Sequence, residues 1–281
     1  GWDVHDVEAA TDRLLALGQG VADPDGEEDT GQRSVFMDVY AALAKFHMKS
    51  FGTTQAQLAA VAAKNHAHSA HNPLSQYREA MTVDEVMAGR KVSWPLTLPM
   101  CSPISDGAAA AIICREEELD RFDRSRSVKI HATALRTGSD RDPQEFDRHV
   151  THLAARDAYE RAGLGPDDMD VAEVHDATAF AEIQQVENLG FCDFGAGGAL
   201  TESGATSIGG RIPVNPSGGL ESKGHPVGAT GLAQVFELTT QLRGEAGGRQ
   251  VSDAKFAIAE NGGGFHGIEE AVACVTILGR D

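Results

Sequence analysis

The residues between positions 211 and 231 offer the clearest candidate chemistry, because glycines, prolines and one histidine gather there directly before a predicted helix. The segment reads RIPVNPSGGLESKGHPVGATG, and its histidine is His225. A glycine-rich loop at a helix N-terminus presents backbone N–H groups to negative charge, and a neighbouring histidine can donate or accept a proton. The loop therefore predicts a site for a developing oxyanion, with a plain glycine-rich turn as the alternative. Its glycine spacing matches neither a dinucleotide-binding motif nor a P-loop.

Other residue types that often perform chemistry are too dispersed to define a site by spacing. The four cysteines are Cys101, Cys114, Cys192 and Cys274. Without a CxxC pair they exclude a zinc ribbon and a disulfide scaffold and favour a reducing, cytoplasmic setting. We expect Cys114 and Cys274 in strand cores and Cys192 in a loop. His66, His68 and His71 do not all share one helix face, so we expect an exposed helix end there and no metal.

Charge and length narrow the classes of partner. The chain has 281 residues, with 24 lysines and arginines against 42 aspartates and glutamates, and a formal net charge of −18. A protein this acidic repels phosphate backbones and anionic membrane surfaces, so we expect neither nucleic acid nor membrane as a partner. The sequence shows no membrane-spanning stretch and no signal-peptide pattern, and it opens on Gly1 instead of a methionine.

The elements that would position His225 alternate along the second half of the chain. Apolar periodicity predicts helices at residues 143–162, 178–188 and 230–243. Runs of β-branched and apolar residues predict strands at residues 128–135, 171–175, 256–259 and 271–278. Helices and strands in alternation indicate a layered α/β domain.

The first part of the chain is mostly helical. Periodicity predicts helices at residues 7–17, at residues 35–49 and from Thr53 or Thr54 to about residue 70, and a capping box from Thr82 to Glu85 predicts a further short helix. The alanine-rich run at residues 107–114 predicts a buried strand. The charged stretch at residues 115–126 then marks a boundary, which divides the chain into residues 1–125 and 126–281.

Four motifs, in order, resemble the thiolase superfamily, and in particular its sterol-carrier-protein-x type thiolase and thiolase-like aldolase branch. They are CSPISDGAAAAI, VAEVHDATAF, NPSGGLESKGHPVGATG and AENGGGFHG. The resemblance implies a layered α-β-α-β-α fold of two α/β halves with mixed five-stranded sheets. Residues 1–125 would be the remainder of an incomplete N-terminal half with a loop or cap region, lacking the nucleophile segment, and residues 126–281 the C-terminal half.

The resemblance also implies roles for individual residues and a substrate class. Substrates would be coenzyme A thioesters, with no bound cofactor. His225 would help form an oxyanion hole and activate a nucleophile, and His175 would orient water or bind the thioester oxygen. The residues expected to contact coenzyme A are Ser102, Ser217, Gly218 and Gly219. The family's habits imply a homodimer and, in this branch, a small OB-fold acyl-CoA-binding partner.

The departures from the family pattern concern its two cysteines. No cysteine here fits the nucleophile, because Cys101 falls where the family has a non-catalytic small residue. Where the proton-shuttling second cysteine would stand, the chain has Ala177 or Glu260. A partly desolvated glutamate can act as a general base, so Glu260 is our candidate, with Asp176 behind it. The alternative is that Glu260 points away and only tunes a strand end.

Three functions follow as hypotheses. The first is an acyl-CoA-dependent acyltransferase that forms or cleaves a C–C bond in lipid metabolism, of acetyl-CoA acetyltransferase or sterol side-chain type. The second is a retro-aldolase without an acyl-enzyme, and the third a non-catalytic acyl-CoA-binding subunit of a hetero-oligomer. Because coenzyme A is anionic, local bases must overcome the acidic surroundings; the candidates are Arg211, Lys223, Arg90 and Lys91.

Overall fold

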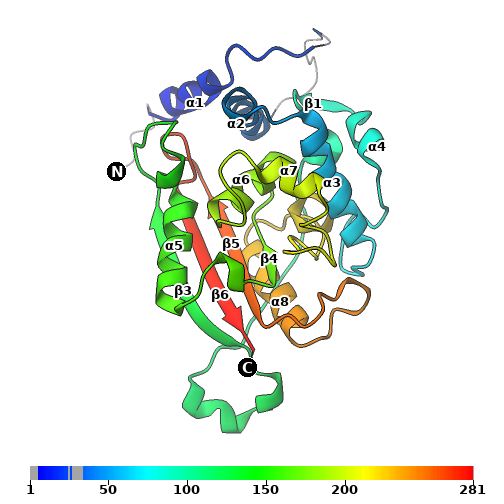
Figure 1. Ribbon diagram of the computed structural model, residues 1–281, viewed down its shortest axis with the longest axis vertical. Helices are drawn as coiled ribbons and strands as arrows, with labels where there is room; N and C mark the ends of the chain where they lie inside the picture. The colour runs from blue at the N-terminus through cyan, green and yellow to red at the C-terminus, as the bar shows by residue number, and fades with distance from the viewer. Residues whose placement is uncertain (1–5, 25, 27–33, 281) are drawn as a thin grey trace.

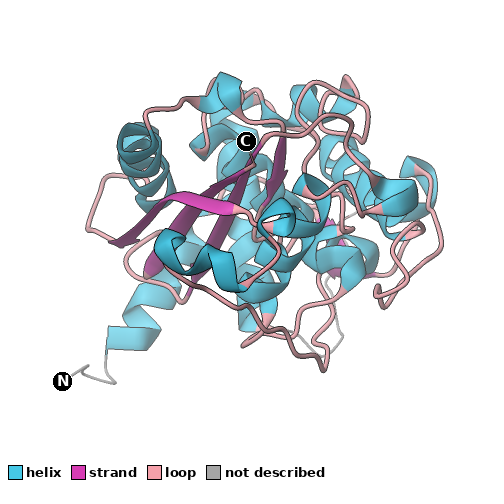
Figure 2. Ribbon diagram, turned by 90° about the horizontal axis from the view of Figure 1, so that it is seen from below, coloured by secondary structure: helices cyan, strands magenta, loops and turns pink. Residues whose placement is uncertain are grey.

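A mixed sheet between layers of helices forms the centre of the molecule (Figures 1 and 2). The computed structural model describes residues 6–24, 26 and 34–280, so the opening residues lie outside it. The strands are β3 (Lys129–Thr137), β6 (Val272–Gly279), β5 (Phe256–Gly263) and β4 (Val171–Glu173), neighbours in that order. β4 and β5 are parallel, and the other neighbours are antiparallel. The predicted alternation and the layered α/β class are confirmed.

Helices cover both faces of this sheet because successive strand residues point to opposite sides. On one face α5 (Val150–Ala162) and α6 (Ala179–Asn188) pack against Ile258 of β5. On the other face α8 (Thr230–Leu242) packs against Ala257 through Leu238 and Leu242. These two apolar layers fix the positions of β4 and β5, whose ends lead into the loops of the site.

The expected fifth strand is reduced to a single bridge. Val214 pairs with Ala172 in the parallel sense, at the free edge of β4. Pro213 and Pro216 stand close on either side of Val214 and have no N–H group to continue a ladder. The regular sheet of the described residues is therefore four-stranded, with Val214 at the position of a fifth strand.

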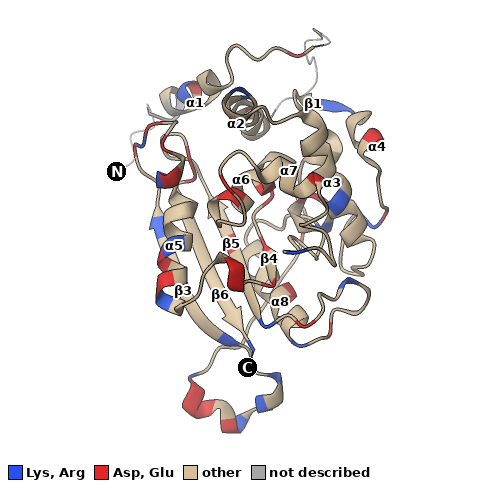
Figure 3. Cartoon of the chain, viewed as in Figure 1, with Lys and Arg blue, Asp and Glu red and all other residues tan. Residues whose placement is uncertain are grey.

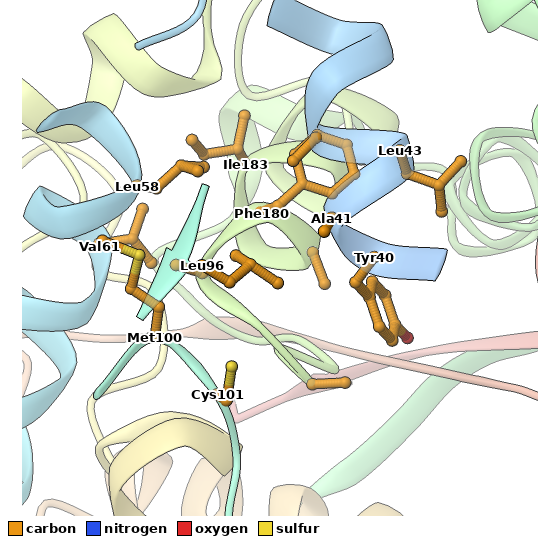
Figure 4. Close-up of a cluster of buried hydrophobic side chains, with 14 of the residues drawn as sticks. Tyr40, Ala41, Leu43, Leu58, Val61, Leu96, Met100, Cys101, Phe180 and Ile183 are labelled. Atoms are coloured by element: carbon orange, nitrogen blue, oxygen red, sulfur yellow. The ribbon is translucent and has the colours of Figure 1, made fainter. Parts of the chain in front are cut away.

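The first part of the chain packs onto the second through α6. Its elements are α1 (Asp6–Leu17), α2 (Val35–Phe51), α3 (Gln55–Ser69), α4 (Val83–Met87), β1 (Lys91–Ser93) and β2 (Leu96–Thr97). The capping boxes at Thr54 and Thr82 are both present. Phe180 and Ile183 of α6 lie in one core with Leu58 of α3 and Leu96 of β2 (Figure 4). Residues on both sides of the expected boundary thus share one apolar cluster.

The predicted buried strand at residues 107–114 is wrong. This segment has no regular secondary structure; Ile112 is 87% exposed and Ile113 75%, and Cys114 is also exposed, contrary to the expected strand core. An apolar run forms a central strand only beside neighbouring strands, and the described residues place none there. The charged stretch that follows forms two exposed 3₁₀ turns, Glu116–Arg121 and Arg124–Arg126, in the excursion at the bottom of Figure 1.

Acidic residues lie inside the molecule as well as on its surface. Figure 3 shows them on the segments around α6 and β4. Glu173 of β4 and Glu182 of α6 are fully buried, as is Glu260 of β5. In the part of the chain that the structure describes, no helix is long and apolar enough to cross a membrane.

Candidate functional site

Two loops bring His175 and His225 together. His175 follows the end of β4, and His225 lies between a single π-helical turn, η6 (Gly219–Lys223), and the start of α8. The two imidazole rings meet edge to face, with 5.1 Å between their centroids and 83° between their planes. The structure therefore places these two sequence-predicted residues side by side.

Hydrogen bonds fix the orientation of the His225 ring. The Thr230 hydroxyl lies 3.2 Å from the Pro226 carbonyl and 2.8 Å from His225 Nδ1. When the hydroxyl donates to Nδ1, the ring proton lies on Nε2, which can then donate to a carbonyl oxygen. Burial, reinforced by the charge of Lys223, lowers the pKa of His225, which keeps the ring neutral.

His175 is also neutral at physiological pH. Burial is the main cause that lowers its pKa to about 3, and the neighbouring His225 adds to the effect. Two neutral imidazoles can each donate one N–H group to the same carbonyl oxygen without repelling each other. This arrangement suits a reaction in which negative charge appears on that oxygen.

Glu260 contacts the backbone of His175. Its side chain is fully buried; Oε2 accepts the His175 N–H at 3.0 Å, and Oε1 has no partner among the described residues. Burial, followed by the negative charge of Glu270, raises the pKa of Glu260 to about 8. A carboxyl group that titrates near neutral pH can both take up and return a proton.

Asp176 has a different set of contacts. Its Oδ1 accepts the Leu220 N–H at 2.7 Å, and its Oδ2 accepts the Glu221 N–H at 3.3 Å and an Asn65 amide N–H at 3.2 Å. These bonds hold the π-helical turn below His225. Asp176 therefore braces the loop, whereas Glu260 keeps one oxygen free.

Residues 101–105, which we name the bridging segment, tie the two histidine loops together. The Ser102 N–H donates to the Ala177 carbonyl at 3.1 Å, and the His225 N–H donates to the Pro103 carbonyl at 3.1 Å. Beyond the segment, an open hollow of about 370 Å³ lies between residues 105–109 and 226–229. Cys101 of the segment is buried, and burial raises the pKa of its thiol to about 12, which disfavours the nucleophilic thiolate.

The other residues expected to contact coenzyme A are internal. Ser217 is fully buried and uses its N–H and hydroxyl on Glu173, at 3.0 and 2.8 Å. Gly218 and Gly219 have φ of 101° and 62°, and a Cβ on Gly219 would lie 2.1 Å from Asp176 Oδ2. Their glycine identity is thus explained by the backbone of the loop, and contact with coenzyme A stays a prediction for Ser102 and these three residues.

The four basic candidates have different surroundings. Lys223 acts electrostatically on both site histidines, so it lies near them. Arg90 is exposed, and its charge acts on the thiol of Cys101. Lys91 is paired with Asp23 at 2.7 Å, and Arg211 donates to the Phe191 carbonyl at 2.6 Å. Lys223 is the cation best placed for an anionic ligand.

The histidines of α3 do not form an exposed helix end. His66 and His68 are each 5% exposed. His68 Nδ1 lies 3.0 Å from the Asn215 carbonyl and its Nε2 accepts the Ile208 N–H at 3.1 Å, while His66 Nδ1 lies 3.1 Å from the Ser222 hydroxyl. The prediction of exposure is wrong for these two residues because the loop before α8 covers this turn, whereas His71, beyond the end of α3, is exposed as predicted. The described residues contain no group of three His, Cys, Asp or Glu side chains suited to a metal ion.

Sequence reasoning missed two side chains near Glu260. Glu270 is buried just before β6, and Tyr40 of α2 is 7% exposed. Burial is the main cause that raises the pKa of Tyr40, followed by the charges of Glu270 and Glu260. An acidic residue directly before an apolar strand was the available signal for Glu270. Nothing in the helical pattern around Tyr40 distinguished it from a core residue.

Comparisons with known proteins agree with this arrangement. Residues 133–280 match the family model described as "Thiolase C-terminal domain-like". The chain is 45% identical over 276 residues to an acetyl-CoA acetyltransferase of Methanothermobacter thermautotrophicus, covering 98% of this chain and 71% of that protein. It is 44% identical over 233 residues to sterol carrier protein 2 of Rattus norvegicus, covering 79% of this chain but only 42% of that protein.

A solved structure shows the same fold. The structure described as "Ltp2-ChsH2(DUF35) aldolase" superposes with a TM-score of 0.76 at 22% identity, covering 99% of this chain and 69% of that chain. Together with the layered sheet and the paired histidine loops, these matches show that the chain belongs to the thiolase superfamily. Within the superfamily it belongs to the branch that resembles the thiolase of sterol carrier protein 2, as the sequence motifs predicted.

Proposed function

We propose that this protein catalyses the formation or cleavage of a C–C bond next to a coenzyme A thioester. The observation that carries the proposal is the neutral pair His175 and His225, with the buried carboxyl group of Glu260 hydrogen-bonded to the backbone N–H of His175. The histidines bind the thioester oxygen, and Glu260 moves a proton at the neighbouring carbon. Relatives named acetyl-CoA acetyltransferase support the acyltransferase form of this reaction.

The chemistry has one step in common whichever way the bond is cleaved. In the acyltransferase form a thiol nucleophile adds to the β-carbonyl carbon and keeps the acyl group as a thioester when the C–C bond breaks. The electron pair of that bond passes to the α-carbon and is delocalised onto the thioester oxygen as an enolate. The histidine pair stabilises the charge on that oxygen. Glu260 in its protonated form then delivers a proton to the α-carbon. In the direction of C–C bond formation, the Glu260 carboxylate removes a proton from the α-carbon.

A retro-aldol reaction is the second candidate. In that case a base takes the proton of a β-hydroxyl group, the C–C bond breaks, and an aldehyde or ketone leaves without an acyl-enzyme. The buried, unactivated thiol of Cys101 favours it, as does the likeness to an aldolase structure. Intact mass spectrometry separates the two: a covalent acyl adduct after incubation with acetoacetyl-CoA supports acyl transfer, and aldehyde release from a 3-hydroxyacyl-CoA without an adduct supports the aldolase.

The enolate step can be tested before the natural substrate is known. Deuterium incorporation at the α-carbon of acetyl-CoA and octanoyl-CoA in D₂O reports it directly. We expect Glu260→Gln to slow incorporation by about 10²-fold or more, while Glu187→Gln, a buried carboxylate paired with His47 3.0 Å away, leaves it unchanged. An exchange rate in Glu260→Gln within threefold of the wild type would contradict the role of Glu260.

Partners are part of the proposal. We expect a homodimer and, from the resemblance of the motifs, an additional small acyl-CoA-binding subunit of OB-fold type; the name of the aldolase structure, which joins Ltp2 with ChsH2(DUF35), supports a second kind of subunit. The exposed apolar residues Ile104, Ile112 and Ile113 precede and follow the segment 105–109 that lines the hollow, and they give such a subunit apolar surface to cover. Size-exclusion chromatography with light scattering measures the assembly.

A further inference from the structure

The parallel ladder between β4 and β5 is interrupted at Glu260. The register of the two strands ends with Glu173 opposite Ala259. One step further along both strands, Val174 would lie opposite Glu260, and His175 would follow. The backbone groups of His175 and Glu260 are therefore the first pair beyond the ladder, and their bonds decide how the two site residues meet.

The contacts of neighbouring residues show that the His175 N–H faces β5. Alternate residues of a strand direct their backbone groups to the same neighbouring strand. The N–H groups of Ala172 and Val174 donate to acceptors in residues 213–215, at 2.9 Å each, on the other side of β4. An uninterrupted parallel ladder would therefore bond the His175 N–H to the Glu260 carbonyl.

Both of these groups have other partners. The His175 N–H donates to Glu260 Oε2 at 3.0 Å, on the side chain instead of the backbone. The Glu260 carbonyl accepts from Gln234 Nε2 at 2.8 Å. Because a carbonyl oxygen can only accept, the NH₂ group of Gln234 must face it, and Gln234 Oε1 accepts from Asn261 Nδ2 at 3.0 Å. Gln234 thus makes the bond that the ladder would give to His175.

The same face of α8 also contacts His225. Thr230 lies one turn before Gln234, and its hydroxyl is 2.8 Å from His225 Nδ1. The His225 ring contacts the ring of His175, with 5.1 Å between the centroids, and the His175 N–H is bonded to Glu260. The contacts therefore form a closed circle, in which Gln234 is the link between α8 and the strand that carries Glu260.

We propose that Gln234 is the positioning residue for the Glu260 carboxyl group: by occupying the Glu260 carbonyl, it leaves the His175 N–H to hold that carboxyl beside the histidine pair. This inference rests on the proposed function, in which Glu260 moves the proton at the α-carbon. Gln234 is 0% exposed, so water does not replace its amide. Without that amide, the Glu260 carbonyl and the His175 N–H satisfy each other, and the carboxyl group is released.

The test identifies the acceptor of the His175 N–H by NMR spectroscopy of the isotope-labelled protein, without any ligand. A long-range HNCO experiment connects an amide nitrogen, through the hydrogen bond, to the carbon that bears the acceptor oxygen. In the wild type we expect the His175 nitrogen to connect to Cδ of the Glu260 side chain. In Gln234→Met, which keeps the volume but removes the amide, we expect the connection to move to the backbone carbonyl carbon of Glu260.

Gln241→Met is the matched control. Gln241 is buried in the same helix, and its Nε2 donates to Glu237 Oε1 and to the Arg249 carbonyl, at 2.9 Å each, away from the histidine loops. We expect Gln234→Met to slow α-carbon exchange of acetyl-CoA about tenfold, because the released carboxyl group is no longer aligned with the α-carbon. Gln241→Met leaves the connection and the rate unchanged. A purely structural role of Gln234 would give the same result in both variants.

Three results would overturn the inference. They are a wild-type connection from His175 to the Glu260 backbone carbonyl, which needs no variant to fold, an unmoved connection in Gln234→Met, and an unchanged exchange rate in Gln234→Met where Glu260→Gln is slowed.

The two assays separate a failure of this inference from a failure of the proposed function. A moved connection in Gln234→Met together with full exchange activity in Glu260→Gln would uphold the positioning by Gln234 and refute the catalytic role of Glu260. An unmoved connection together with slow exchange in Glu260→Gln would refute the positioning and leave the proposed function standing.

Discussion

Lys64→Met tests whether a single buried cation stabilises the cluster of buried carboxyl groups around Asn65. Lys64 is 7% exposed; its ammonium group lies 2.8 Å from Glu182 Oε1 and donates to Asn65 Oδ1 at 2.8 Å and to the Val214 carbonyl at 2.7 Å. The ammonium group thus donates two hydrogen bonds, and its contact with Glu182 Oε1 is an ion pair without a hydrogen bond. The bond to Asn65 Oδ1 also turns the Asn65 NH₂ group toward Asp176.

The magnitude follows from what the variant leaves behind. Asn65 Nδ2 also donates to Glu182 Oε2 at 2.9 Å and to Glu221 Oε2 at 3.1 Å, so three carboxyl groups surround one amide. Removing the cation from a buried ion pair typically costs about 3–5 kcal/mol, and the Val214 carbonyl also loses its donor. We expect Lys64→Met to lower the free energy of unfolding by about 4 kcal/mol at pH 7.

The assay is urea unfolding followed by circular dichroism at pH 5 and at pH 8. Burial, reinforced by the neighbouring carboxylates, raises the pKa of Asp176 and of Glu221, and loss of Lys64, whose charge lowers the pKa of Glu221, raises the pKa of Glu221 further. Proton uptake relieves the uncompensated charge, so the cost of the variant is smaller at pH 5. Lys129→Met, at an exposed strand position, is the control and changes stability by less than about 0.5 kcal/mol. A loss in Lys64→Met below about 1 kcal/mol, or one equal at both pH values, would refute the reasoning.

Three further predictions concern stability and reactivity. Because burial raises the pKa of Glu260 to about 8, the native state binds more protons than the unfolded state above the ordinary value of 4.5. The free energy of unfolding therefore falls as pH rises from 4.5 to 8, by an upper limit of about 5 kcal/mol, and Glu260→Gln flattens the profile in urea titrations. Gly219→Ala combines a φ of 62° with a Cβ 2.1 Å from Asp176 Oδ2, so we expect it to lower the free energy of unfolding by more than about 2 kcal/mol in thermal unfolding. Gly204→Ala, at a φ of 80° with open space around the Cβ, is the control and costs about 1 kcal/mol. Equal losses of stability in the two variants would contradict this account. We expect a thiol reagent to modify exposed Cys114 before buried Cys101. Peptide mapping measures the order of modification, and the reverse order would contradict the described exposure.

The sequence was sufficient for what depends on local pattern. The helices around Leu58 and Leu238, the N-cap of Thr54, the capping box at Thr82, and the glycine-rich loop of His225 all follow from periodicity and turn chemistry. The motifs also identified the superfamily. In each case the signal lies within about one helix length of chain.

What the sequence could not show depends on contacts between distant segments. Glu270 meets Gln185 across 85 residues, and His68 is covered by a loop 147 residues away. The apolar run before Cys114 indicates that something must cover it, but its composition cannot say whether a strand pairs with it. Periodicity describes one element at a time, whereas burial is a property of several.

The bridging segment makes the two histidine loops one cooperative unit. Its backbone joins the loop of His175 through Ser102 and the loop of His225 through Pro103, while Cys101 at its start lies in the core shared with α2 and α3. If the first part of the chain opens, both loops lose their common tether in the same event. The spacing of the two histidines therefore depends on contacts from the first part of the chain as well as on the direct bonds from Asp176 to the loop of His225.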